Sequence, residues 1–111
     1  MLNKNTTSAI PPLKKLFFTW SGIEPDQVVP IKGGGSNRQY FRLGSENITA
    51  IGVYNDVIPE NVAYFRLTSH FKIHGLRVPD ILMVDHDNQH YLLQDIGHDD
   101  LLSVIENIDP S

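Results

Sequence analysis

The fold is decided by one stretch of the chain, which reads Gly33-Gly34-Gly35-Ser36-Asn37-Arg38-Gln39-Tyr40-Phe41-Arg42-Leu43. Three consecutive glycines can adopt φ > 0 and bring bare backbone N–H groups close to an anion, which is typical of a phosphate-binding turn. The residues that follow have the composition of a β-strand, so Tyr40, Phe41 and Leu43 can anchor the turn to a core. The stretch therefore predicts a binding loop held on a rigid support.

Short runs of β-forming residues continue on both sides of this strand. They are separated by turn-forming segments: the glycines themselves, Gly44-Ser45-Glu46-Asn47 and His86-Asp87-Asn88-Gln89. The runs predict strands at 27–32, 38–43, 48–54, 80–85 and 90–95, of which the first three form an antiparallel meander.

Other segments show the three- and four-residue apolar spacing of a helix face. One runs from about Pro12 to Ser21, a second from about Glu60 to His74, and the last begins at Asp99 or Asp100, which suit a helix N-cap. The inward side of the second helix is predicted to carry Val62, Phe65, Leu67 or Thr68, Phe71 and Ile73. The expected fold is α+β: a five-stranded antiparallel sheet with a helix between strands 3 and 4, plus an N-terminal and a C-terminal helix.

The composition is ordinary for one globular domain covering residues 1–111, of which residues 1–9 are expected to be disordered. A net charge of −4 argues against nucleic acid as a partner, because binding a phosphate backbone relies on clustered Lys and Arg. The lack of cysteine excludes disulfides, thiolate metal sites and a Cys nucleophile. Apolar runs stay far below the roughly 20 residues that cross a bilayer, and the N-terminus lacks a signal-peptide core. We expect no membrane partner and a cytoplasmic location.

Several His and Asp residues have the spacing of metal ligands. In the predicted hairpin these are Asp85, His86, Asp87 and His90, but residues of a turn tend to point in different directions and mostly into solvent. His70 and His74 lie four apart on the second predicted helix, where an exposed face accounts for them, and His98-Asp99-Asp100 is better explained as a helix start. The sequence therefore predicts no metal site.

The order of the elements and four pieces of sequence resemble the small N-terminal lobe of protein-kinase-like phosphotransferases. The resemblance is nearest to the aminoglycoside phosphotransferase and choline kinase superfamily, especially its bacterial amino-sugar kinase branch. The pieces are Gly34 to Leu43, the helix start from Glu60 to Phe65, His74-Gly75-Leu76-Arg77-Val78-Pro79-Asp80-Ile81-Leu82, and Tyr91-Leu92-Leu93-Gln94-Asp95-Ile96-Gly97. Together they cover about residues 28 to 105.

The resemblance implies half of a nucleotide site. In that family the glycine- and serine-rich loop lies over the nucleotide phosphates, which implies phosphate-side roles for Gly34, Gly35, Ser36 and Asn37, with added positive charge from Arg38. The segment that joins the two lobes of such kinases binds the adenine edge through backbone groups, and it corresponds here to Gln94, Asp95, Ile96 and Gly97. ATP and Mg²⁺ are the implied cofactors of the full-length protein.

The chain also departs from the family pattern. Such kinases usually carry a lysine in the third strand that pairs with a glutamate of the following helix, but 48–54 contains no lysine, which leaves Glu60 without that partner. The amino-sugar kinase branch often lacks this lysine as well. The catalytic loop and the metal-binding carboxylates belong to a C-terminal lobe whose motifs are not found here, so the chain is expected to be truncated before that lobe and inactive alone.

Two functions follow from these patterns. The first is the nucleotide-binding lobe of a small-molecule kinase that, in full length, transfers the ATP γ-phosphoryl group to a hydroxyl of a sugar or amino alcohol. The alternative is a non-catalytic protein-interaction or regulatory module on a kinase-lobe scaffold. In the first case the expected partners are a nucleotide and the missing C-terminal lobe, and the lobe face left open is expected to promote self-association.

Overall fold

The computed structural model describes residues 4–32, 38–75 and 78–108. Within them the chain forms α1 (Lys4–Ser21), β1 (Gln27–Ile31), β2 (Gln39–Ser45), β3 (Ile48–Tyr54), α2 (Ile58–Ile73), β4 (Ile81–Val84), β5 (His90–Gln94) and α3 (His98–Ile108). The α+β class, the element order and the helix between β3 and β4 are confirmed. The strand ends agree with the predicted ones to within two residues.

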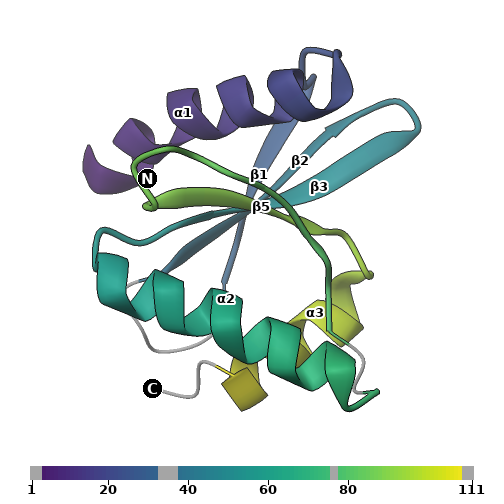
Figure 1. The fold of residues 1–111 in the computed structure, drawn as a ribbon. Helices are drawn as coiled ribbons and strands as arrows, with labels where there is room; N and C mark the ends of the chain where they lie inside the picture. The colour runs from purple at the N-terminus through teal and green to yellow at the C-terminus, as the bar shows by residue number, and fades with distance from the viewer. Residues whose placement is uncertain (1–3, 33–37, 76–77, 109–111) are drawn as a thin grey trace.

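All five strands form one antiparallel sheet in the order β1-β2-β3-β5-β4. Helix α1 covers one face, and α2 and α3 lie against the other (Figure 1). Each face has its own core. On the α1 side the buried residues are Ala9, Leu13, Leu16, Phe17, Phe41, Leu43, Ala50 and Leu92. On the α2/α3 side they are Tyr40, Ile51, Val53, Tyr64, Tyr91, Leu93 and Leu101.

Helix α1 is longer than the sequence predicts, because it begins at Lys4 and carries Pro11 and Pro12 inside it. The predicted start at Pro12 is therefore wrong, while the disorder expected for residues 1–9 stays a prediction and residues 1–3 lie outside the described part. Proline inside a helix costs a hydrogen bond. Here Pro11 is exposed and Ala9 is buried against the sheet, so the apolar stripe continues through the prolines and stabilises the extra turns.

Helix α2 also differs from its predicted packing. Its buried positions are Asn61, Tyr64 and Thr68, whereas Ile73 is 82% exposed. Apolar spacing therefore gave the wrong inward face at the C-terminal end of the helix, although the alternative Thr68 was correct. The reason lies in tertiary contacts: the side-chain amide of Asn61 replaces an apolar contact with hydrogen bonds to two backbone carbonyls.

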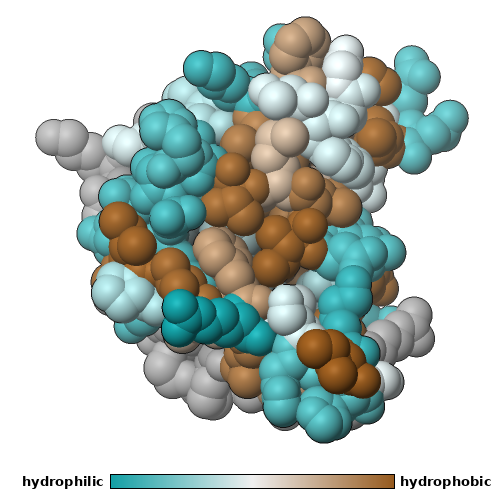
Figure 2. Space-filling view, in the orientation of Figure 1, coloured by the Kyte–Doolittle hydropathy of each residue, from teal (hydrophilic) through white to brown (hydrophobic). Residues whose placement is uncertain are grey.

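Strand β4 forms one edge of the sheet, and all four of its apolar side chains are partly exposed. Apolar side chains gather at the centre of Figure 2, in the region between α1 and α2. No described helix combines the length and the apolar character needed to pass through a bilayer.

Candidate functional site

An ion pair on the α2/α3 face links β2 to the end of β5. The Nε of Arg42 donates to Oδ2 of Asp95 at 2.9 Å, and Nη2 donates to Oδ1 at 3.3 Å. Arg42 lies opposite Ile51 in the β2–β3 register, and Ile51 belongs to the core beneath α2 and α3. Because paired residues share a face, the bidentate pair lies on that side of the sheet.

Asp95 is held as a carboxylate. Burial opposes its ionisation, but hydrogen bonds from the Arg42 guanidinium, the Gly97 backbone and the Thr49 side chain outweigh burial and lower the pKa of Asp95. The Gly97 N–H donates to Asp95 Oδ1 at 3.0 Å. Gly97 has a φ of +95°, a conformation that glycine adopts without steric cost, and α3 begins at the next residue. The network thus fixes how the chain leaves the sheet.

Gln94, at the end of β5, is tied to the segment before β4. Its backbone N–H donates to the Asp80 carbonyl at 2.8 Å, and its side-chain Oε1 accepts from the Asp80 N–H at 3.2 Å. Ile96 packs against the α2/α3 core. The four residues from Gln94 to Gly97 therefore form one ordered turn, and Arg42 of β2 holds it through Asp95.

Arg38 lies at the other end of β2. Its Nη2 donates to the Glu60 carbonyl at 3.1 Å, and its guanidinium carbon lies 5.7 Å from the centre of the Tyr64 ring. It is therefore placed over the first turns of α2. Gln39 pairs with Tyr54 of β3, and Gln94 pairs with Ala50 of the same strand. The two pairs are therefore four residues apart along β3, which is about 13 Å of extended strand. The glycine-rich turn residues Gly34, Gly35, Ser36 and Asn37 lie outside the described residues.

The middle of this face has no cationic side chain from β3. Thr49, Ile51 and Val53 alternate onto the same side, as the pairing of Ile51 with Arg42 requires. Neighbouring β1 contributes Val29, which is 50% exposed and lies opposite Arg42. Ile51 and Val53 are fully buried, so the exposed apolar side chain among these residues is that of Val29, opposite the charged pair.

The side chain of Glu60 is hydrogen-bonded to an asparagine. Its Oε1 accepts a hydrogen bond from Nδ2 of Asn55 at 2.9 Å. Asn55 is buried, and its Oδ1 accepts from the Val57 N–H, which orders the entry to α2. This role of Asn55 was not predicted. The short interval between β3 and the helix is the signal that could have revealed it, since an Asn there commonly forms such a turn.

The Arg42–Asp95 contact was also not predicted. The two residues are 53 positions apart, and no local pattern joins them. Only the β2–β3–β5 register places them side by side.

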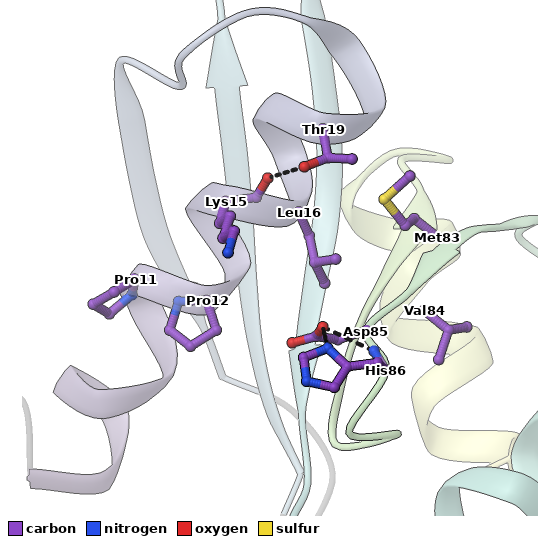
Figure 3. A pocket seen from close by; sticks show the side chains of 9 residues that line it. All are labelled: Pro11, Pro12, Lys15, Leu16, Thr19, Met83, Val84, Asp85 and His86. Carbon is purple, nitrogen blue, oxygen red and sulfur yellow. Dashed lines mark hydrogen bonds and ion pairs between the residues drawn. The ribbon is translucent and has the colours of Figure 1, made fainter.

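On the opposite side of the sheet, a cavity of about 610 Å³ lies between α1 and the β4–β5 hairpin. Figure 3 shows Pro12, Lys15 and Leu16 of α1 along one wall and Met83 of β4 along the other, with Asp85 and His86 at one end. The side chains of this hairpin were predicted to point in different directions. For Asp85 that prediction is wrong, because its carboxylate lies within 4.8 Å of ligand atoms of Asp87 and His90.

Comparisons of the chain with models of protein families and with curated proteins found no match.

Proposed function

We propose that this chain is the nucleotide-binding lobe of a small-molecule kinase of the aminoglycoside phosphotransferase and choline kinase type. The observation that carries the proposal is the layout of the α2/α3 face. Arg38, next to the glycine-rich turn, lies at one end of β2, and the ordered turn from Asp95 to Gly97 lies at the other. An elongated ligand with an anionic end and a flat apolar end suits such a face.

Each end has the chemistry of its part of a nucleotide. Arg38 adds positive charge on the side where phosphates would lie. At the other end, the half-exposed apolar side chain of Val29 lies opposite Arg42 and thus beside a rigid turn, which suits a planar base. In the whole protein this lobe would help to bind ATP while its γ-phosphoryl group passes to a sugar or amino-alcohol hydroxyl.

The Mg²⁺ ligands of such a reaction would come from a second lobe. The Asp95 carboxylate is engaged by Arg42 and by the Gly97 amide, so it is not available to coordinate a metal against the phosphates. Phosphoryl transfer also needs a residue that orients the acceptor hydroxyl. We therefore assign binding, and not catalysis, to this chain.

The first test is calorimetric titration of the chain with Mg·ATP. We expect weak or undetectable heat, since only one wall of the site is present. Micromolar affinity of this chain for Mg·ATP would contradict the proposal that two lobes are needed to form the nucleotide site.

The second test is the natural reading frame that contains this sequence. A frame that continues past Ser111 into an H-x-D-x-x-x-x-N loop and a later metal-binding Asp supports the kinase proposal. The protein encoded by that longer frame should phosphorylate an amino sugar. A stop codon directly after Ser111 would contradict it.

The composition of β3 favours the alternative, a non-catalytic interaction module. The side chains that β3 turns to the face are Thr49, Ile51 and Val53, with no lysine to contact phosphates. A chain that ends naturally at this point, stays monomeric in light scattering and shows no response to Mg·ATP would support this second function.

A further inference from the structure

Three side chains with metal-binding chemistry converge at the β4–β5 turn. They are Asp85, Asp87 and His90, and their ligand atoms all lie within 4.8 Å of one another. The Nδ1 of His90 is 2.9 Å from Oδ2 of Asp87 and 3.9 Å from Oδ2 of Asp85. This cluster lies at one end of the cavity between α1 and the hairpin, because Asp85 belongs to both.

Turn formation explains one oxygen of each carboxylate but not the other. Oδ1 of Asp85 accepts from the His86 N–H at 2.8 Å, and Oδ1 of Asp87 accepts from the Gln89 N–H at 2.8 Å. Both are local contacts with the backbone, and the bond to Gln89 is that of an Asx-turn. The two Oδ2 atoms have no such role, yet both are directed at the same ring nitrogen of His90.

His90 makes the cluster more than a group of surface acids. Its side chain is only 9% exposed, and its ring lies against Tyr54 with 4.7 Å between the ring centres. Since a carboxylate can only accept, the Nδ1 of His90 must carry the proton that is shared with Asp87. A buried imidazole is thus aimed at two carboxylates from a fixed position.

The turn is held in place from outside the cluster. The side-chain amide of Asn61 on α2 donates to the Asn88 carbonyl at 2.7 Å, and the Asn55 N–H donates to the Gln89 carbonyl at 2.9 Å. Both asparagines are buried. The ligand geometry is therefore set by β3 and α2 as well as by the hairpin.

The spacing fits a small divalent ion. Ligand atoms that are bound at about 2.0–2.2 Å in a tetrahedral site are about 3.4 Å apart. The two separations from His90 Nδ1, 2.9 and 3.9 Å, lie on either side of this value, and all three ligand atoms lie within 4.8 Å of one another. Imidazole with carboxylates suits Zn²⁺ and related transition ions, whereas Mg²⁺ and Ca²⁺ prefer oxygen ligands alone.

We propose that Asp85, Asp87 and His90 bind a divalent transition-metal ion of the Zn²⁺ class. The ion takes the place of the Nδ1 proton of His90, which is released to solvent. His86 is the nearest source of a fourth ligand, because its side chain is 94% exposed and its Nδ1 already lies 2.9 Å from Oδ1 of Asp85. Water completes the coordination otherwise.

The test is titration of the untagged chain with ZnCl₂ in a non-chelating buffer, followed by calorimetry. We expect one equivalent to bind with micromolar affinity and to raise the melting temperature. His90→Gln should weaken binding by about tenfold or more. The matched control is the double variant His70→Gln/His74→Gln, which removes the exposed pair on α2 whose rings lie 4.4 Å apart. That variant should keep the tight site.

Asp87→Asn is a second variant for the zinc titration if His90→Gln fails to fold. It keeps the shape of the side chain in the turn while removing a charged ligand. Cobalt(II) spectra of the same proteins should show tetrahedral bands that are lost in Asp87→Asn. Zinc binding that survives both cluster variants but disappears with the α2 histidines would overturn the proposal. So would the absence of binding at millimolar zinc.

Discussion

Arg42 and Asp95 show how one polar contact can fix the exit of a chain from a sheet. Both side chains are largely buried, with 28% and 12% exposure, so their two hydrogen bonds are shielded from water. A bidentate Arg–carboxylate pair has a defined geometry as well as favourable energy. Asp95 also accepts from Gly97, so the pair positions the turn that leads into α3.

Replacing this carboxylate tests that role. Asp95→Asn should lower the free energy of unfolding by about 1–2 kcal/mol at pH 7, because the Arg42 guanidinium loses its charged partner in a partly buried place. Urea unfolding followed by circular dichroism measures the change. Asp56→Asn, at an exposed position, is the control and should change little.

The Arg42–Asp95 pair also makes the stability difference between the wild type and Asp95→Asn depend on pH. The pKa of Asp95 is lower in the folded protein than in the unfolded chain, so its contribution to stability is fully present above about pH 4. That contribution is lost as the pH falls through the folded-state pKa. The difference in stability between the wild type and Asp95→Asn should therefore shrink in acid. A difference that stays constant down to pH 2 would contradict the assigned interaction.

Gly52 makes room for α1 on the other side of the sheet. A Cβ at this position would lie 2.7 Å from Cδ1 of Leu43 and 3.0 Å from Cδ1 of Leu13, and both leucines are fully buried. Gly52→Ala should thus destabilise the fold by about 1–3 kcal/mol through overpacking. Gly44→Ala is the matched control, since its nearest contact is the exposed Thr49 side chain. Equal thermal stability of the two variants would argue against a close approach of α1.

The elements with strong periodicity were predictable from sequence, and those shaped by distant polar contacts were not. Strand β3 was predicted with its observed ends, because its β-forming residues are bounded by clear turn signals. Helix α2 was found, but its inward face was wrong at Ile73. The buried face carries the polar residues Asn61 and Thr68; Thr68 was among the predicted inward positions, but apolar spacing gives no sign of Asn61.

The candidate site was likewise predictable from the sequence only in part. The resemblance to kinase-like lobes pointed to Arg38 and to Gln94–Gly97, because the sequence pieces that carry it are local. The partners of these residues were not predictable, because Glu60 and Arg42 meet them only through packing of α2 and the sheet register. The convergence at Asp85 and His90 likewise depends on the angle at which the hairpin turns.

Asn61 is the residue through which α2 is joined to both neighbouring segments. Its Nδ2 donates to the carbonyls of Asn55 and Asn88, each at 2.7 Å, and the side chain is completely buried. Asn61→Ala should cost about 2–3 kcal/mol, because the buried Asn55 carbonyl and the partly buried Asn88 carbonyl lose their donor. Amide hydrogen exchange should also speed up locally around the β4–β5 turn. A uniform change in exchange over the whole chain would instead indicate a loss of global stability only.

The molecule as a whole consists of two cores that share one sheet. Helix α1 packs on one face through Leu13 and Phe17, and α3 packs on the other through Leu101. Strands β2, β3 and β5 contribute buried side chains to both cores by alternation. Loss of either layer would expose the apolar face of the same strands, so we expect the two cores to unfold together.

Trp20 offers a direct test of this coupling, because it lies on α1 beside Phe17, with ring centres 5.7 Å apart, and is the sole tryptophan. Leu101→Ala removes a buried side chain on the opposite face and should cost about 2–4 kcal/mol. If the sheet couples the two cores, the urea midpoint seen by Trp20 fluorescence should fall as far as the midpoint seen by far-ultraviolet circular dichroism. Phe17→Ala, on the α1 side, should show the same coincidence. A fluorescence midpoint that stays at the wild-type value in Leu101→Ala would mean that α1 and its core unfold independently of α3.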